Sequence, residues 1–213
     1  MTSKILIFTD LDGTLLDRDT FEFKKISNYI KDIILKGIII IPNSSKTREE
    51  IDIFNKELKE NLPFIVENGA AIYNLNAINS SFPEKISLSR ECAEILEIFE
   101  SKISYKLKKK CKFVNNLTFD EQIKKFGLPK EKLKYAMNRE YTIPLIFDGS
   151  KNEKIDLFKS VRKVGLSLQE GGRIINLCDK TSKAQAMKMV VKIFKKIIKE
   201  KLITLGIGDN FND

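Results

Sequence analysis

The chain has 213 residues, of which 42% are apolar and 31% are charged, a balance typical of a soluble globular protein rather than a disordered one. Its formal net charge of +9 favours an anionic partner, which could be a phosphorylated small molecule, a nucleic acid or an acidic surface. The absence of histidine excludes serine–histidine and cysteine–histidine catalysis as well as imidazole metal sites. Any chemistry must therefore use carboxylates, lysines, hydroxyls or backbone groups.

The sequence also indicates in which cellular compartment the protein would work. The three cysteines, Cys92, Cys111 and Cys178, lack the short spacing of a zinc or redox motif and indicate reduced thiols. No secretory signal is visible, because the apolar N-terminal run leads directly into two aspartates. The longest apolar stretch, residues 33–42, is interrupted by a lysine and is too short to span a bilayer. We therefore expect a cytoplasmic protein with no membrane partner.

The first predicted strand, residues 4–9, is a continuous apolar run followed directly by Asp10-Leu11-Asp12-Gly13-Thr14. In open α/β sheets, ligands bind beyond the carboxyl ends of the strands. Two carboxylates at such an edge are costly unless a cation lies between them, and Mg²⁺ takes oxygen ligands. The motif therefore predicts a magnesium site. The alternative is an acidic turn in which an aspartate caps a helix.

Helical spacing of apolar residues predicts a helix over residues 23–36, and a second buried strand follows over 38–41. After this strand comes the sequence Asn43-Ser44-Ser45-Lys46-Thr47. Its hydroxyls and backbone N–H groups, together with the dipole of the next helix, would form a site for an anion. Thr47 and Glu50 predict a capping box for that helix, which runs to about residue 60. Ordinary N-capping without ligand binding is the alternative.

Residues 64–66 form a third predicted strand, and strands that alternate with helices argue for a parallel, doubly wound sheet. The pattern changes near residue 80, where residues 80–83 resemble a linker. Beyond it we predict a mixed α+β block with its own small sheet. Its elements are helices near 89–101, 129–138 and 152–163, a strand over 142–147, and a hairpin of 167–170 with 173–178 turning at Gly171-Gly172.

The last part of the chain resumes the style of the first eighty residues, with an amphipathic helix over 182–200 and a buried strand over 202–207. We therefore predict a discontinuous core domain, residues 1–80 and 179–213, with an inserted domain of residues 81–178. Asp209 follows the last strand and would lie on the same edge as Asp10, where a further carboxylate suits a divalent cation; an Asn/Asp turn is the alternative. Lys183 could neutralise a phosphate there, or could be an ordinary solvated helix lysine.

These four motifs, in this order, resemble the haloacid dehalogenase superfamily of phosphatases: an aspartate pair, a serine after the next strand, a lysine after the insert, and Gly-Asp-x-x-Asn-Asp over residues 208–213. An insert placed after Glu67-Asn68-Gly69-Ala70-Ala71-Ile72 is similar to the branch with an α/β cap domain. Three further segments are similar to mannosyl-3-phosphoglycerate phosphatases: residues 44–51, Arg139-Glu140-Tyr141-Thr142-x-Pro144, and Gly171-Gly172-Arg173 ahead of Asp179-Lys180. The resemblance covers the whole chain and implies an α/β fold, a Rossmann-like core with an inserted α+β cap.

The resemblance implies a Mg²⁺-dependent phosphomonoester hydrolase that converts mannosyl-3-phosphoglycerate to mannosylglycerate, a compatible solute. Asp10 would attack phosphorus, and Asp12 would serve as general acid and base. Mg²⁺ would be held by Asp10, the backbone carbonyl of Asp12, and Asp209. The remaining implied roles are phosphoryl binding by Ser44 and Lys183, support of Lys183 or of the metal's waters by Asp213, and binding of the substrate carboxylate by Arg139 and Arg173.

Departures from the family pattern leave alternatives open. The family normally continues past the last motif with a further helix and strand, so the resemblance implies a core truncated at its C-terminus, and a non-catalytic remnant is one alternative. Asn176 stands where relatives often have a histidine, so another sugar phosphatase, such as one acting on the glucosyl analogue, is a second. The basic run from Lys106 to Lys112 suggests a nucleic-acid-binding module as a third, but it has no interleaved aromatic residues. We expect a sugar phosphate as the partner and no nucleic acid; the sequence leaves the oligomeric state open.

Overall fold

The computed structural model describes residues 3–18, 20–170 and 174–209. The chain folds into two compact units, a core unit of residues 1–88 and 181–213 and an inserted unit of residues 89–180. The sequence placed these boundaries after residues 80 and 178. The first boundary differs because the expected linker is followed by β5 (Lys85–Ser87), which pairs antiparallel with β4 (Ala71–Tyr73) and so belongs to the core unit.

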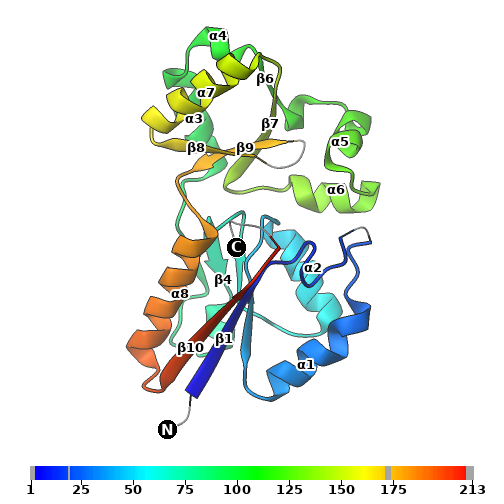
Figure 1. Ribbon diagram of the computed structural model, residues 1–213, viewed down its shortest axis with the longest axis vertical. Helices are drawn as coiled ribbons and strands as arrows, with labels where there is room; N and C mark the ends of the chain where they lie inside the picture. The colour runs from blue at the N-terminus through cyan, green and yellow to red at the C-terminus, as the bar shows by residue number, and fades with distance from the viewer. Residues whose placement is uncertain (1–2, 19, 171–173, 210–213) are drawn as a thin grey trace. The chain divides into compact units, whose positions relative to one another are not determined.

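The main sheet of the core unit has three parallel strands in the order β10-β1-β2, namely β10 (Lys201–Ile207), β1 (Ser3–Thr9) and β2 (Ile39–Pro42). A parallel bridge between Asn43 and Ile65 joins β2 to β3 (Phe64–Val66), from which β4 and β5 continue antiparallel. The helix α8 (Lys183–Ile197) lies on one side of the strands, and α1 (Ser27–Leu35) and α2 (Arg48–Leu58) lie on the other (Figure 1). This arrangement confirms the predicted doubly wound core.

Apolar burial explains why these elements pair. Leu6 and Phe8 of β1 and Ile41 of β2 pack into one cluster with the buried face of α8, which consists of Ala186, Val190 and Phe194. Each large side chain that is fully buried contributes about 1.5–3 kcal/mol. All three residues lie within the amphipathic helix that the sequence predicted over residues 182–200. The cluster therefore fixes α8, and with it residue 183 at its first turn, against the sheet.

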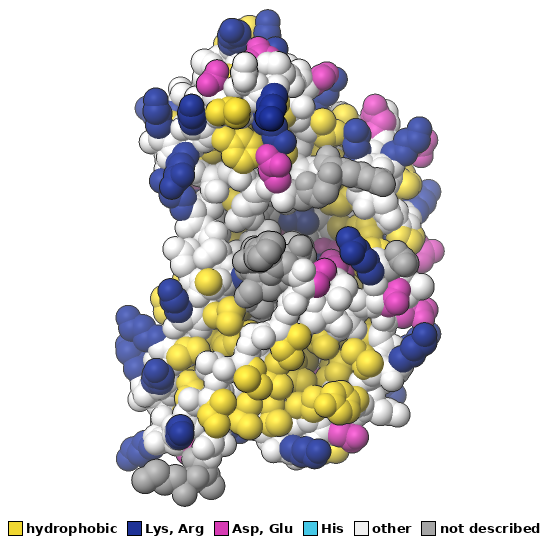
Figure 2. Space-filling model, in the orientation of Figure 1, with side chains coloured by type: hydrophobic (Ala, Val, Ile, Leu, Met, Phe, Trp, Pro, Cys, Tyr) yellow, Lys and Arg dark blue, Asp and Glu magenta, His cyan; other side chains and the backbone are white. Residues whose placement is uncertain are grey.

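The last strand differs from the prediction of a buried strand. β10 pairs with β1 along its whole length, yet Ile203, Leu205 and Ile207 are 38%, 49% and 48% exposed. The reason is that β10 lies at the edge of the sheet, and within the described part of the chain no element covers the face on which these alternate residues lie. Figure 2 shows apolar side chains gathered on the side of the core unit where β1 and β10 run.

The inserted unit has a separate four-stranded antiparallel sheet in the order β6-β7-β9-β8, as the sequence suggested. Ile143, Leu145 and Leu177 of this sheet share a core with residues of α3 and α7. The strands β8 and β9 form the predicted hairpin, whose turn lies outside the described residues. The elements of this unit are α3 (Cys92–Lys102), α4 (Tyr105–Lys108), β6 (Cys111–Phe113), α5 (Phe119–Phe126), α6 (Lys130–Met137), β7 (Thr142–Phe147), α7 (Lys151–Lys163), β8 (Leu166–Glu170) and β9 (Ile175–Asp179).

Candidate active site

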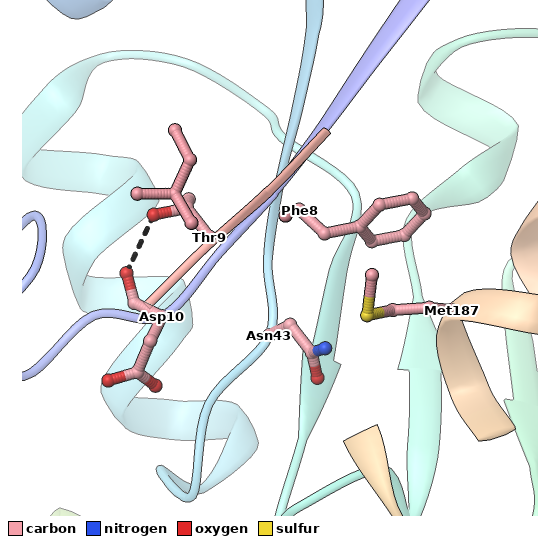
Figure 3. Close-up of a pocket in the computed structure, with 7 residues that line it drawn as sticks. Phe8, Thr9, Asp10, Asn43 and Met187 are labelled. Atoms are coloured by element: carbon pink, nitrogen blue, oxygen red, sulfur yellow. Dashed lines mark hydrogen bonds between the residues drawn. The ribbon is translucent and has the colours of Figure 1, made fainter. Parts of the chain in front are cut away.

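Polar segments meet at the carboxyl ends of β1, β2 and β10. The backbone N–H of Asp10, directly after β1, donates to the carbonyl of Ile207 at the end of β10 (2.9 Å), and the N–H of Asn43 donates to the carbonyl of Thr9 (2.8 Å). In Figure 3 the carboxylate of Asp10 and the amide of Asn43 point in the same direction. The parallel register therefore brings residues from the two ends of the chain to one edge of the sheet.

Asp10 forms a buried ion pair with Lys183, the first residue of α8. The ammonium Nζ of Lys183 lies 2.7 Å from Oδ1 of Asp10, and the two residues are only 4% and 7% exposed. A charge without a partner would be costly at this depth, and the close pairing of the two side chains offsets that cost. Lys183 is therefore not the solvated helix lysine that the sequence left as the alternative.

Asp12 is paired with a second lysine, which the sequence-based site did not include. Nζ of Lys46 lies 3.0 Å from Oδ1 of Asp12 and 3.3 Å from Oε1 of Glu50. Burial acts against the charged form of Lys46, but the carboxylates of Glu50 and Asp12 outweigh it and raise the pKa of Lys46 above its ordinary value. A signal was present in the sequence, since Lys46 directly follows the two serines of the predicted anion site.

Ser44 is fully buried at the start of the segment that leads into α2. Its backbone N–H donates to the carbonyl of Ile65 (3.1 Å), its carbonyl accepts from the N–H of Asn68 (3.0 Å), and its Oγ accepts from the N–H of Lys46 (3.3 Å). These bonds fix the side chain while leaving its hydroxyl hydrogen able to donate. The capping box predicted for α2 is confirmed: Thr47 accepts from the N–H of Glu50, and the Glu50 carboxylate accepts from the N–H of Thr47.

The carboxylate of Asp209 lies against the loop that carries Asp10 and Asp12. Gly13 in that loop has a φ of +79°, and a Cβ built there would be 2.9 Å from Oδ2 of Asp209. Glycine therefore suits this position, because it adopts the left-handed backbone easily and leaves room for the carboxylate.

The oxygen atoms grouped here suit Mg²⁺. The carboxylates of Asp10 and Asp209 and the carbonyl of Asp12 are hard donors of the kind that this ion prefers. Asn43, which lines a small pocket beside Asp10, has a buried Oδ1 with no hydrogen-bond partner among the described residues. Across the same residues, no group of three or more Cys, Asp or Glu side chains is arranged to hold a metal. The predicted ligand set has only two carboxylate side chains, and its third ligand is the backbone carbonyl of Asp12.

The structure describes one of the three remaining predicted residues, Arg139. Arg139 belongs to the inserted unit, where its Nη1 donates to Oγ1 of Thr142 (2.8 Å) and its Nε donates to the carbonyl of Ala136 (3.1 Å). Arg173 and Asp213 lie outside the described residues, so their roles stay predictions.

The site combines a carboxylate paired with a buried lysine and two further carboxylates close by, at the carboxyl ends of parallel strands. This combination is typical of phosphoryl-transfer hydrolases. The chain matches the haloacid dehalogenase-like hydrolase family over residues 7–213 and belongs to that family. Within it, the chain is similar to phosphatases, as the sequence motifs indicated. Among the described residues, no helix is long and apolar enough to cross a membrane.

Two curated relatives show where in the family the chain lies. It is 34% identical to a glucosyl-3-phosphoglycerate/mannosyl-3-phosphoglycerate phosphatase of Persephonella marina, over 98% of this chain and 80% of the relative. It is 32% identical to the mannosyl-3-phosphoglycerate phosphatase of Pyrococcus horikoshii, over 98% of this chain and 84% of the relative. The predicted similarity to mannosyl-3-phosphoglycerate phosphatases is thereby confirmed.

Solved structures support the fold. A haloacid dehalogenase-like hydrolase from Bacteroides thetaiotaomicron matches with a TM-score of 0.70 and 17% identity, over 99% of this chain and 83% of that one. A haloacid dehalogenase-like hydrolase from B. subtilis matches with a TM-score of 0.65 and 18% identity, over 98% and 84% of the two chains.

Proposed function

We propose that this chain is a Mg²⁺-dependent phosphomonoesterase that hydrolyses mannosyl-3-phosphoglycerate through an aspartyl-phosphate on Asp10. The observation that carries the proposal is the buried pair of Asp10 with Lys183 at 2.7 Å, together with the Asp209 carboxylate at the Gly13 loop. A buried carboxylate held by a lysine, at an edge able to take an oxygen-ligated cation, is suited to attack phosphorus.

In the first step, a carboxylate oxygen of Asp10 forms a bond to phosphorus while the bond from phosphorus to the sugar-acid oxygen breaks. Asp12, two residues further along the loop, gives its proton to the departing alkoxide. Ser44 and Lys183 donate hydrogen bonds to the equatorial phosphoryl oxygens. Positioning and charge neutralisation supply most of the acceleration in transfers of this kind.

In the second step, Asp12, now a carboxylate, takes a proton from a water molecule that attacks the same phosphorus. The acyl–phosphate bond breaks, inorganic phosphate leaves, and Asp10 is restored as a carboxylate. Asp10, Asp209 and the carbonyl of Asp12 would hold Mg²⁺, which supplies positive charge against the phosphoryl oxygens and the carboxylates.

The glucosyl analogue is the second candidate substrate, because some relatives of this chain are named for both substrates. The relatives from Persephonella marina and Methanococcoides burtonii, 34% and 30% identical to this chain, are named for both the glucosyl and the mannosyl substrate. Turnover of the two glycosyl phosphoglycerates, compared by kcat/KM on the same preparation, separates a mannosyl-specific enzyme from one that accepts both.

Replacing the nucleophile tests the mechanism. Asp10→Asn keeps the shape of the side chain but removes its charge, so phosphate release in the presence of Mg²⁺ is expected to fall at least about 1,000-fold, the scale of losing a nucleophile. Phosphate release is measured with mannosyl-3-phosphoglycerate, and a thermal melt of the variant shows that it is folded. Undiminished turnover by folded Asp10→Asn would rule out the aspartyl-phosphate.

A further inference from the structure

A turn of unusual backbone geometry connects β3 to β4 in the core unit. Its three successive residues, Glu67, Asn68 and Gly69, all have left-handed backbone angles, with φ of +47°, +59° and +95°. Left-handed conformations are uncommon for residues other than glycine, because their side chains strain the backbone there. Such a run persists only where the surrounding contacts fix it, and it points to a role for the turn.

One side of the turn is fixed to the Ser44 segment by backbone hydrogen bonds. The N–H of Glu67 donates to the carbonyl of Lys46, and the N–H of Asn68 donates to the carbonyl of Ser44, both at 3.0 Å. Glu67 is also buried, at 1% exposure. The turn therefore moves together with the segment that carries Ser44 and Lys46.

The other side of the turn lies against the start of α8. A Cβ built on Gly69 would be 2.2 Å from the carbonyl oxygen of Ser182 and 2.8 Å from the backbone nitrogen of Lys183. Both atoms are backbone atoms, so they cannot yield as the end of a flexible side chain would. Only glycine allows the two chain segments to approach this closely.

We propose that the turn Glu67–Gly69 is a positioning element, in which Gly69 sets where α8 begins and thereby holds Lys183 against Asp10. The inference rests on the proposed function of Lys183 and Asp10. Since Lys183 is the first residue of α8, a displacement of its backbone is carried directly to its ammonium group. The same turn holds the Ser44 segment, so it fixes the two proposed phosphoryl-binding residues relative to each other.

The test compares two glycine-to-alanine variants. Gly69→Ala introduces a Cβ that must push the start of α8 away from the turn. Gly37→Ala is the matched control, since Gly37 also lies in the core unit with a left-handed φ of +78°. Apart from its chain neighbours, no described residue has an atom within 4 Å of its would-be Cβ. Both variants carry the backbone strain, and only the first carries the collision.

We expect Gly69→Ala to lower kcat for phosphate release about 100-fold, the scale of a misplacement near 1 Å, with KM changed by less than about threefold. Gly37→Ala is expected to keep the kcat of the parent chain. If Gly69→Ala retains the kcat of Gly37→Ala, the positioning role is overturned.

A double-mutant cycle with Lys183→Met asks whether Gly69 acts through Lys183. If it does, Gly69→Ala lowers kcat far less in the Lys183→Met background than in the parent chain. The same cycle is measured by denaturant unfolding, where the two effects are also expected to be less than additive because both weaken the Lys183–Asp10 pair. Full additivity in unfolding would overturn the inference. This readout needs no turnover, so it stands even if the parent chain hydrolyses no phosphate ester and the proposed function fails.

A second pair of variants covers the case in which Gly69→Ala does not fold. Ser182→Gly makes the colliding segment able to rotate its carbonyl, while the backbone nitrogen of Lys183, 2.8 Å from the added Cβ, must still move. The comparison is then Ser182→Gly against Ser182→Gly/Gly69→Ala. A loss of kcat confined to the second variant supports the proposal, and equal kcat in the two contradicts it.

Discussion

Lys46 links the proposed general acid and base to the rest of the site. It contacts Asp12 at 3.0 Å and Glu50 at 3.3 Å, and its side chain is only 11% exposed. The Asp12 side chain is 37% exposed, so without this partner it would be free to adopt other rotamers. We therefore regard Lys46 as the residue that orients Asp12, because its ammonium lies between Asp12 and Glu50.

Lys46→Met tests this role. The variant keeps much of the side-chain volume but removes the ammonium, so Asp12 loses its partner next to Glu50. We expect kcat to fall about 10- to 100-fold, a part of the 10²–10⁴ that a positioned general acid and base supplies. The pH dependence of kcat should change as well, since the charges facing Asp12 change.

Lys56→Met is the control, because Lys56 lies on α2, the helix that follows the Lys46 segment, and is exposed. We expect it to leave kcat and the pH profile unchanged. An unaltered pH profile in Lys46→Met, with turnover like that of the control, would contradict the orienting role.

At the scale of elements, the N-terminal cap of α2 should affect both the stability of the fold and the position of the site residues before it. Thr47 is fully buried and closes the capping box three residues after Ser44. Loss of such a cap typically costs about 1 kcal/mol. Because the cap residue directly follows the segment that holds Ser44 and Lys46, its loss should loosen that segment too.

Thr47→Ala is therefore expected to lower the free energy of unfolding by about 1 kcal/mol and also to reduce kcat. Ser150→Ala is the control, since Ser150 closes an equivalent capping box at α7 of the inserted unit. We expect a similar loss of unfolding free energy from Ser150→Ala without a loss of kcat. Denaturant unfolding and steady-state assays measure the two quantities. Equal kcat for both variants would show that the α2 cap serves stability alone.

At the scale of the whole molecule, the chain passes twice between the two units. An ion pair joins the beginning and the end of the inserted segment near these two crossings. Arg90 lies just after the first crossing and Asp179 just before the second. The guanidinium donates from Nε and Nη2 to the two carboxylate oxygens at 2.9 and 2.8 Å, and the N–H of Arg90 donates to Oδ2 at 3.2 Å. The hydrogen bonds from Arg90 outweigh burial and lower the pKa of Asp179 to about 2.

This ion pair predicts that the inserted unit loses stability at acid pH. A carboxyl group whose pKa is lower in the folded chain than the ordinary 3.8 binds protons more readily when unfolded. Its contribution is therefore present above about pH 4 and is lost as the pH falls towards 2. Asp179→Asn should remove this contribution, so the variant is less stable at neutral pH and shows a flatter decline between pH 4 and 2.

Denaturant unfolding at several pH values measures this effect. Asp148→Asn serves as the control, because Asp148 pairs with Lys112 at the surface and its side chain is 72% exposed. Such exposed pairs contribute little. Parallel stability curves for Asp179→Asn and the parent chain over this range would refute the expectation.

Local patterns in the sequence were enough to predict much of the core unit. The apolar run before Asp10, the helical spacing in α8 and the Thr47–Glu50 capping box all appear as predicted, because each depends on residues close together in the chain. Placing Asp10 and Asp209 at one edge followed from the rule that parallel strands share a carboxyl end. The exposed side of β10 and the place of β5 in the core unit were missed, since both depend on which element lies alongside.

The sequence by itself determined the class of fold and the family, and it predicted which carboxylates react, because these follow from the residue types and their order along the chain. Only the tertiary structure decided which lysine pairs with which aspartate: Lys183 with Asp10, and Lys46 with Asp12. It also decided that Gly69 lies against the start of α8. These contacts join residues far apart in the sequence, and their distances depend on how the strands, the turn and the helix pack together, which no local pattern records.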